Sequence, residues 1–259
     1  MERGWAVVTG ASSGIGQAFA RELARKGWQV LAVARRQDRL EALAREVAEH
    51  GGRAVPLVAD LGTAKGLASV SERLAQLGTV DLLVNNAGVV TSGDFQRSLL
   101  QTELAATHLN VDAVVALTHA VLGGMVQRRN GAIVNMASVV AFQPFPHFAV
   151  YAAGKAFVLS FSEALAEELK GTGVRILAVC PGAAKTEMQA FSHNPGLLGR
   201  FPSLSAERVV REALAALEHG RVVRIVGFLN AMLVFLNRFM PRAAVRWIMG
   251  RVVKAAPGV

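Results

Sequence analysis

The chain has 259 residues, and its 52% of hydrophobic against 18% of charged residues excludes the fibrous and disordered classes of protein. Its single cysteine, Cys180, excludes a disulfide framework and a cysteine-rich zinc site, so we expect no bound metal. The formal net charge of +9 does not indicate nucleic-acid binding, because seven basic and no acidic residues follow His219, and only 21 basic against 19 acidic residues precede it.

Short β-branched runs alternate along the chain with amphipathic stretches of helical period. The predicted strands are Trp5–Thr9, Gln29–Ala34, Arg53–Ala59, Asp81–Val84, Ala132–Met136, Val174–Val179 and Val222–Val226. The predicted helices include Gln17–Arg25, Leu40–Ala48, Glu103–Arg128 and Val150–Lys170. This alternation predicts an α/β fold: one doubly wound parallel sheet of about seven strands, flanked by helices on both faces, in a single domain over residues 1–259. In such a sheet, ligands bind beyond the carboxyl ends of the strands.

A glycine-rich segment directly follows the first predicted strand and precedes the first predicted helix. It reads Thr-Gly-Ala-Ser-Ser-Gly-Ile-Gly over residues 9–16. Glycines at this junction let the backbone approach a phosphate closely, and a helix N-terminus supplies free N–H groups and a favourable dipole. The alternative is a tight strand-to-helix turn without a ligand. The candidate phosphate-binding residues are Gly10, Ser12, Ser13, Gly14, Ile15 and Gly16.

This string, with three residues between its first two glycines, resembles the cofactor loop of the short-chain dehydrogenase/reductase family, which is built on a single Rossmann domain. The resemblance runs from about Trp5 to Met188 and implies a nicotinamide dinucleotide cofactor. It places Asp60 and Leu61 at the adenine ring, and Asn86, Ala87 and Gly88 beside the cofactor. In isolation, Asp60 fits a helix cap equally well, and the Asn86–Gly88 segment fits a turn.

Two cations, Arg35 and Arg36, directly follow the second predicted strand, where a site that prefers NAD usually carries an acidic residue. Cations at a helix start oppose the helix dipole, so a solvated pair is slightly disfavoured. A 2′-phosphate would remove this conflict. With Ser12 or Ser13 nearby, the pair therefore predicts NADP(H) rather than NAD(H) as the cofactor.

A hydride transfer to a carbonyl needs a protein acid that protonates the developing alkoxide. Tyr151 is the candidate acid, because Lys155 lies four residues later on the same helix face, where an ammonium would lower the pKa of the phenol. The family resemblance adds Ser138 as the hydrogen-bond donor to the substrate carbonyl. It also adds Asn110 as the residue that holds a water linking the lysine to solvent, although Asn110 alone fits an exposed helix amide equally well.

The resemblance further implies that Pro181, Gly182 and Thr186 position the nicotinamide and pyrophosphate, and that Tyr151 and Lys155 also contact the cofactor. Gly154 departs from the family pattern, in which many members carry Ser or Thr before the lysine. A glycine there loosens the helix start by about 1 kcal/mol relative to alanine, but it removes no reacting group.

Two segments diverge from the family. Residues 190–204 are rich in Gly and Pro and are interpreted as a substrate lid, or as a loop packed on the surface. Residues 228–254 form an apolar and basic C-terminal extension, too short in its apolar part for a spanning helix. Its composition fits a helix in a subunit interface or over the substrate cleft, an interfacial helix on anionic lipid, or a site for the phosphates of an acyl-CoA.

Together these patterns predict an NADPH-dependent carbonyl reductase that interconverts a hydrophobic ketone or aldehyde and an alcohol. The alternatives are a 3-oxoacyl thioester reductase and a non-catalytic dinucleotide-binding regulator. The resemblance implies a homodimer or homotetramer. We expect a cytoplasmic protein, because Met1–Gly4 runs into an apolar strand without the pattern of a secretory signal, with peripheral membrane contact through residues 228–254 as a further hypothesis.

Overall fold

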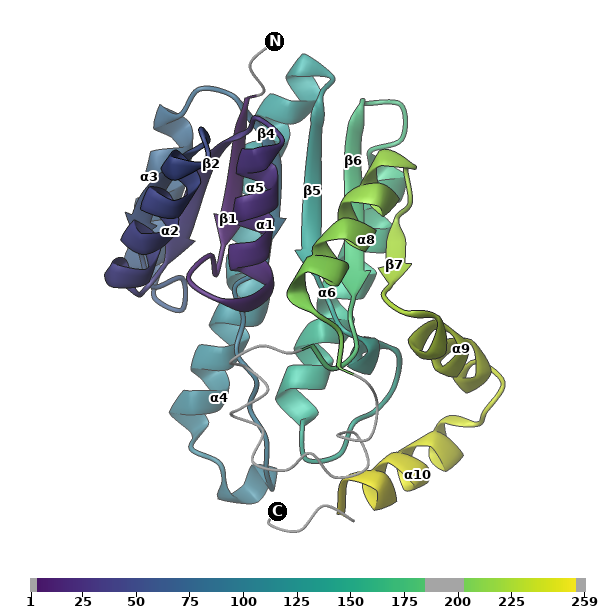
Figure 1. Cartoon of the computed structure of the whole chain (residues 1–259). Coiled ribbons are helices and arrows are strands. Elements are labelled where there is room, and N and C mark those ends of the chain that lie inside the picture. Colours follow the sequence, from purple (N-terminus) through teal and green to yellow (C-terminus); the bar gives the residue numbers. More distant parts are fainter. Residues whose placement is uncertain (1–3, 185–202, 255–259) are drawn as a thin grey trace.

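The computed structural model describes residues 4–184 and 203–254. Seven strands, all parallel, form one sheet in the order β3-β2-β1-β4-β5-β6-β7 (Figure 1). The strands are β1 Trp5–Thr9, β2 Gln29–Ala34, β3 Arg53–Val58, β4 Val80–Asn85, β5 Gly131–Met136, β6 Val174–Cys180 and β7 Val223–Ile225. The predicted doubly wound α/β sheet is confirmed, and each predicted strand end lies within one residue of the observed end.

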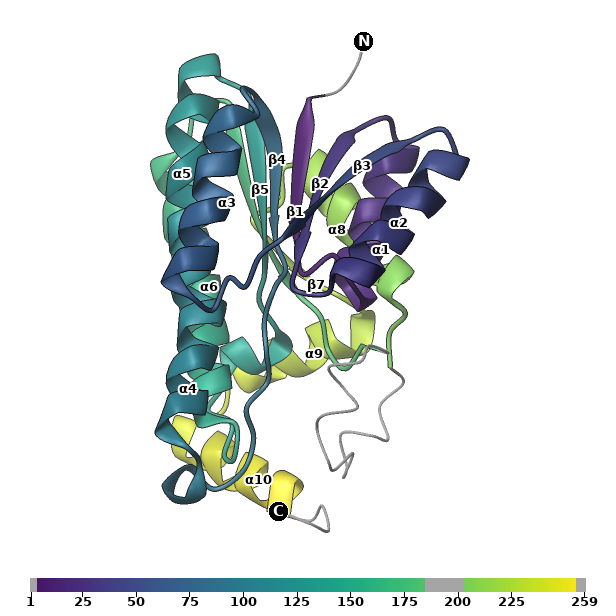
Figure 2. The same cartoon turned by 90° about the vertical axis from the view of Figure 1, so that its left-hand side faces the viewer.

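Helices cover both faces of this sheet (Figure 2). One layer holds α1, α2 and α8, the other holds α3, α5 and α6, and α4, α9 and α10 extend beyond the carboxyl ends of the strands. The helices are α1 Gly14–Arg25, α2 Gln37–Glu49, α3 Ala64–Gln76, α4 Leu100–Thr107, α5 Ala113–Arg128, α6 Ala149–Glu168, α8 Ala206–Glu218, α9 Phe228–Asn237 and α10 Arg242–Lys254.

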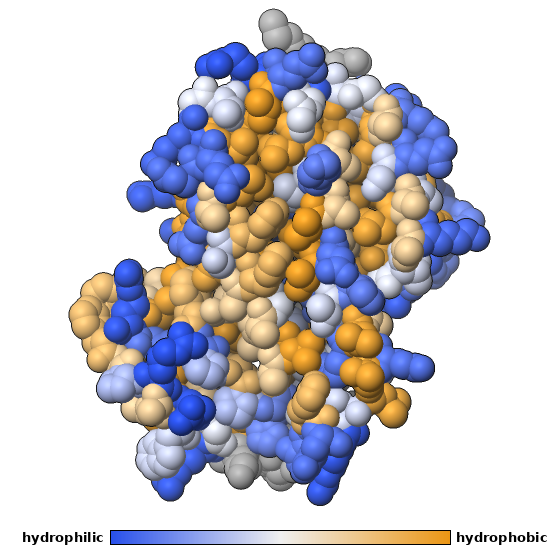
Figure 3. All heavy atoms as spheres, turned by 180° about the vertical axis from the view of Figure 1, so that it is seen from behind, coloured by the Kyte–Doolittle hydropathy of each residue, from blue (hydrophilic) through white to orange (hydrophobic). Residues whose placement is uncertain are grey.

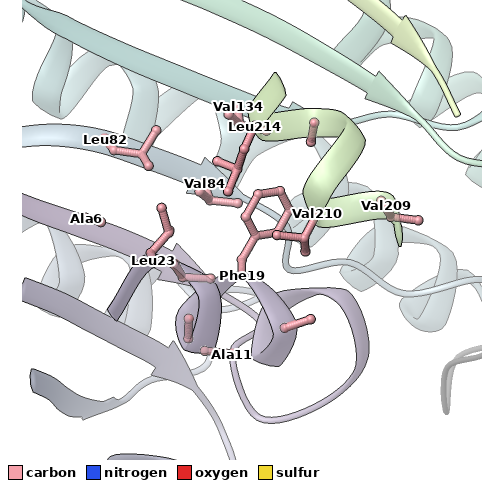
Figure 4. Close-up of a cluster of buried hydrophobic side chains, with 14 of the residues drawn as sticks. Ala6, Ala11, Phe19, Leu23, Leu82, Val84, Val134, Val209, Val210 and Leu214 are labelled. Atoms are coloured by element: carbon pink, nitrogen blue, oxygen red, sulfur yellow. The ribbon is translucent and has the colours of Figure 1, made fainter. Parts of the chain in front are cut away.

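The layer of α1 and α8 buries the centre of the sheet. Phe19 of α1 points to Val210 and Leu214 of α8, and Leu23, four residues further along α1, packs in the same cluster with Leu82 and Val84 of β4 (Figure 4). The side chain of Phe19 is fully buried. This packing holds the N-terminus of α1 at the carboxyl end of β1, where the glycine-rich segment turns.

The sheet also defines where a ligand binds. From β1 the chain winds outward through β2 and β3, then returns to the other side of β1 as β4 and continues through β7. The strand order therefore reverses between β1 and β4, and in sheets of this kind ligands bind beyond the carboxyl ends of the strands at the point of reversal. The segments that follow β1, β4, β5 and β6 all meet at this edge.

One predicted helix, Glu103–Arg128, differs from the structure. The chain forms α4, a π-helical turn over His108–Asp112, and then α5. The wide turn contains Asn110, whose side chain binds the backbone of Val89 and so draws the helix towards β4. By length and composition, Leu100–Arg128 and Ala149–Glu168 pass for membrane-spanning helices, but both pack one side into the core under the sheet.

Candidate active site

The glycine-rich segment places open backbone donors at the reversal point of the sheet. Gly10 has a φ of 68°, a conformation that favours glycine. Helix α1 follows with Ser13 at its N-cap position, no side-chain cap and no acidic residue in its first turn. The first N–H groups of α1 therefore keep their capacity to bind an anion, which fits the pyrophosphate of a dinucleotide.

Asn86 and Thr9 fix the segment after β4 against this loop. Asn86 donates from its side chain to Thr9 O at 2.9 Å, and the backbone N–H groups of Asn86 and Ala87 both donate to Thr9 Oγ1 at 2.9 Å. The Asn86-Ala87-Gly88 segment is thus held by hydrogen bonds against the end of β1, so it is more than a surface turn.

Arg36 lies directly beside the phosphate loop. Its guanidinium donates to Ser12 Oγ, from Nε at 3.2 Å and from Nη2 at 3.0 Å, and the Ser12 side chain is buried. Arg35 is exposed at the same end of β2. The structure therefore brings Ser12 and Arg36 together where the sequence predicts a 2′-phosphate.

Asp60 and Leu61 follow β3 at the same edge. Asp60 Oδ1 accepts a hydrogen bond from Gly62 N at 3.0 Å, while Thr63 provides the N-cap of α3 by accepting from Gly66 N at 3.1 Å. Asp60 is therefore a turn residue rather than the helix cap. The side chain of Leu61 is buried in the hydrophobic core.

Ser138 and Tyr151 lie together beyond the end of β5. The hydroxyl of Ser138 donates to Pro181 O at 3.5 Å and lies near enough to Tyr151 to affect its pKa. Burial raises the pKa of Tyr151 above its ordinary value, and the hydrogen bond from Ser138 opposes this shift. The sequence predicts the opposite direction, with Lys155 lowering this pKa.

The reason for the difference is the state of Lys155. This side chain is buried, its Nζ donates to Met136 O at 2.7 Å, and Nζ lies 5.8 Å from the centroid of the Tyr151 ring. Burial lowers the pKa of Lys155 to about 8. Because the pKa of Lys155 is lower than that of Tyr151, the lysine has lost its charge at the pH where the phenol ionises. Burial therefore determines the direction of the pKa shift of Tyr151.

The side chains of Asn110 and Lys155 both lie close to Gly88. A Cβ on Gly88 would lie 2.8 Å from Asn110 Oδ1 and 3.5 Å from Lys155 Nζ, so only glycine leaves this space open. Asn110 is buried, accepts a hydrogen bond from Val89 N at 3.1 Å and donates to Val89 O at 2.9 Å. The alternative interpretation of Asn110 as an exposed helix amide is therefore wrong.

The segment after β6 closes the site from the other side. Pro181 O accepts a hydrogen bond from Val139 N at 3.1 Å, and Gly182 lies against Asn230 at the start of α9. Cys180 is a buried strand thiol, as predicted, and burial raises its pKa to about 12. Thr186 and residues 190–202 of the predicted lid lie outside the described residues, while Leu204 is buried and pairs with Ala184.

A buried polar network beneath the site is absent from the predictions. Asn85 Nδ2 donates to Asn135 Oδ1 at 2.9 Å and to Thr118 Oγ1 at 3.2 Å, and Asn135 Nδ2 donates to Ser162 Oγ at 2.9 Å. These side chains tie β4 and β5 to α5 and α6, the helices that carry or adjoin Asn110 and Tyr151. The only sequence signal is an asparagine at equivalent positions of two apolar strands.

The fold and this site define a class of protein: a nucleotide-binding α/β enzyme whose candidate catalytic groups lie at the carboxyl edge of the sheet. The profile of the short chain dehydrogenase family matches residues 4–195. The chain therefore belongs to the short-chain dehydrogenase family, and it is an oxidoreductase that uses a nicotinamide dinucleotide.

The chain is similar to characterised and solved members of this family. It is 42% identical over 208 residues to a short chain dehydrogenase of Pseudocercospora fijiensis, covering 78% of this chain and 67% of that protein. It is 35% identical to human 17-beta-hydroxysteroid dehydrogenase type 3, covering 81% and 67%. A short-chain dehydrogenase from Sphingobium yanoikuyae, solved with NADPH, has a TM-score of 0.81 and 33% identity, with 93% of this chain and 98% of that chain covered.

The ionisation of Tyr151 is directly measurable, because it is the only tyrosine. We expect its phenolate absorbance to appear with a midpoint above the ordinary value of about 10 in the cofactor-free protein. Ser138→Ala should raise the midpoint further, since the hydrogen bond from Ser138 favours the phenolate. Ser160→Ala, on the exposed side of α6, is the control and should leave it unchanged. A midpoint that falls in Ser138→Ala contradicts the assigned hydrogen bond.

The pKa of Lys155 predicts a pH-dependent stability. Lys155 binds its proton less tightly in the folded state, with a pKa of about 8, than at its ordinary 10.5 in the unfolded chain. Between these values the unfolded state holds more protons, so stability rises with pH. We expect the unfolding free energy of the wild type to gain about 3 kcal/mol over Lys155→Met across this window.

Urea unfolding at both ends of the window measures this gain. Lys170→Met is the control, because the Lys170 ammonium is exposed and pairs with Glu167 at 2.6 Å; the wild type should show no such gain over it. Parallel pH profiles of the wild type and Lys155→Met would show that Lys155 is not buried as described.

Proposed function

We propose that the protein is an NADPH-dependent carbonyl reductase, which converts a ketone or aldehyde to an alcohol and runs reversibly. The observation that carries this proposal is the pairing of a partly buried phenol, Tyr151, with a hydroxyl group, Ser138, near a buried amine, Lys155, at the edge where the cofactor loop lies. When bound, the nicotinamide supplies the hydride. Everything else in the reaction is assigned to side chains of this chain.

Tyr151 is the proton donor in this proposal. Because burial raises its pKa, the phenol stays protonated at neutral pH and holds the proton that the new alkoxide oxygen needs. Ser138 donates a hydrogen bond to the same oxygen, which stabilises the negative charge that develops there. Both side chains must therefore face the carbonyl from one side, as their proximity allows.

Lys155 restores the proton to Tyr151. A lysine with a pKa of about 8 is a stronger acid than a tyrosine whose pKa lies above 10, so proton transfer from ammonium to phenolate is downhill. Asn110, at the Gly88 gap beside Nζ, supports the route by which Lys155 exchanges its proton with solvent. The same buried lysine also orients the cofactor ribose.

The preference for NADPH follows from the cations at the end of β2. Arg35 and Arg36 offer charge to a 2′-phosphate, and the contact of Arg36 with Ser12 holds it against the phosphate loop. Solved family members with NADPH or NADP support this choice, among them the protein from Sphingobium yanoikuyae. The other assigned cofactor contacts are the α1 N-terminus, Asp60, Asn86-Ala87-Gly88, Pro181, Gly182 and Thr186.

A hydrophobic carbonyl compound is the proposed substrate. The relatives support a bulky apolar substrate: a Comamonas testosteroni alcohol dehydrogenase described as bulky-bulky ketone specific has a TM-score of 0.79 and 31% identity, with 94% and 97% coverage. A polyketide ketoreductase with a TM-score of 0.76 favours a 3-oxoacyl thioester as the second candidate. We also propose a homo-oligomer that uses the outer side of α4–α6, where Leu104, Val115 and Phe157 are exposed.

The reaction is tested by NADPH oxidation against a panel of bulky ketones, aldehydes and 3-oxoacyl thioesters. We expect turnover of apolar carbonyl compounds, and a loss of about 10²–10⁴-fold in kcat for Tyr151→Phe, because the phenolic proton is then missing. The NADPH affinity of this variant is the control and should change far less than kcat, because only one hydroxyl contact to the cofactor is removed. No turnover of any substrate would favour the non-catalytic regulator, while full activity of Tyr151→Phe would remove the acid role.

Cofactor preference has its own test. In Arg36→Ala we expect the dissociation constant for NADPH to rise by about 10- to 100-fold, since a charge-assisted contact to phosphate is lost, and that for NADH to stay nearly constant. Arg45→Ala, an exposed arginine on α2, is the matched control. Equal losses for both cofactors in Arg36→Ala would mean that Arg36 only supports the loop.

A further inference from the structure

Helix α9 turns polar side chains towards the protein and most of its apolar side chains towards solvent. Its two asparagines face inward: Asn230 Nδ2 donates to Val226 O at 2.8 Å, and Asn237 Nδ2 donates to Gln143 Oε1 at 2.8 Å. Most of its apolar side chains face outward instead, whereas Val234 is buried. Six of its ten residues are exposed and apolar, namely Phe228, Leu229, Met232, Leu233, Phe235 and Leu236. A helix that only packs on its own domain has the opposite arrangement.

The apolar surface continues past the end of α9. Phe239 is 73% exposed and Trp247, on α10, is 59% exposed. The inner side of α10 is already occupied, because Val253 and Met249 pack with Phe145 near the start of α6. The outer sides of α9 and α10 are thus one exposed surface, which we name the α9–α10 face. Pale orange and orange atoms mark it at the lower left of Figure 3.

The charge of this region has one sign. No acidic residue follows Glu218 in the sequence. Among the described residues, Arg238, Arg242 and Arg246 are exposed and form no ion pair, and the guanidinium of Arg251 lies 3.9 Å from the ring centroid of Trp247. Aromatic and aliphatic side chains therefore lie among unpaired cations.

We propose that the α9–α10 face binds the surface of an anionic lipid bilayer. Phenylalanine, leucine and tryptophan side chains would enter the headgroup boundary, and the arginines would meet lipid phosphates. Helices of 10 and 13 residues are shorter than the about 20 residues that cross a bilayer, so they lie in its plane. Because α9 and α10 extend from the carboxyl edge of the sheet, this surface adjoins the edge that carries Ser138 and Tyr151 (Figures 1 and 2).

A second copy of the chain fits this face poorly. In a symmetric dimer the same patch meets itself, so the four arginines of one subunit would face the same arginines of the other. No acidic residue of this region is present to pair with them. Buried like charges cost free energy that the apolar contacts would have to overcome. Lipid phosphates, in contrast, complement both the apolar and the cationic groups.

Vesicle flotation tests the proposal on the full chain. We expect the protein to float with vesicles of phosphatidylcholine and phosphatidylglycerol, to bind pure phosphatidylcholine at least about tenfold more weakly, and to be released by salt. The fluorescence of the wild type should shift to the blue on binding, and this shift should be lost in Trp247→Phe, because Trp247 is the tryptophan in the face.

Two variants separate the apolar and cationic contributions. Phe235→Ser with Phe239→Ser, and Arg238→Gln with Arg242→Gln, should each weaken binding to anionic vesicles by about tenfold or more. The matched controls are Phe95→Ser, an exposed phenylalanine before α4, and Arg45→Gln with Lys65→Gln, exposed cations on α2 and α3. These should bind as the wild type does. Thermal unfolding and reduction of a water-soluble ketone should stay unchanged in all four.

Three results would overturn the proposal. The first is an absence of wild-type binding to anionic vesicles at low ionic strength. The second is equal binding by the Phe235→Ser, Phe239→Ser variant and the wild type. The third is a wild-type oligomer that this variant dissociates in analytical ultracentrifugation, without any vesicle binding, which would assign the face to a second copy. None of these results bears on NADPH oxidation, so the lipid surface and the reductase activity stand or fall separately.

Discussion

The burial of Lys155 beneath Tyr151 is the constraint on which the site depends. Removing an ammonium from water costs several kcal/mol, and one strong hydrogen bond to Met136 O offsets only part of that cost. The amine therefore holds its proton weakly, while the same dry surroundings make the phenol hold its proton tightly. One environment thus shifts the two pKa values in opposite directions, which in the proposed reaction would favour the movement of a proton from lysine to tyrosine.

This arrangement needs neighbours that keep the pocket in shape. The end of β5 supplies Met136 and Ser138, and α6 supplies Tyr151 and Lys155, so the spacing between β5 and α6 sets the distances in the site. Asn135 and Ser162 join these two elements by a buried hydrogen bond, and Asn85 extends the network to β4. Leaving any of these groups unpaired would cost about 1–3 kcal/mol. The network therefore resists changes in the spacing of β4, β5 and α6, and so in the distances within the site.

The strands were predictable from sequence because a β-branched run buried on both sides of a parallel sheet leaves a strong local signal. The glycine-rich loop and the Tyr151–Lys155 spacing likewise express local geometry. The π-helical turn could not be predicted, since His108–Asp112 continues a helical pattern and its distortion comes from a contact of Asn110 with Val89, 21 residues earlier. The raised pKa of Tyr151 was missed for a similar reason: it follows from burial, which depends on the whole fold.

The C-terminal region shows where composition ends and structure begins. The sequence shows that residues 228–254 are apolar and basic, and this composition fits a helix in a subunit interface or over the substrate cleft as well as a helix on anionic lipid. In the structure, most of the apolar side of α9 faces outward, because Asn230 and Asn237 take inward positions and bind the backbone and Gln143. Rotating the helix to bury its phenylalanines would leave the side-chain amides of Asn230 and Asn237 without these partners. At about 25 cal/mol per Å² of apolar surface, the outward side chains forgo substantial stabilisation in the isolated chain, and a lipid surface that covers them recovers it without disturbing the polar contacts beneath.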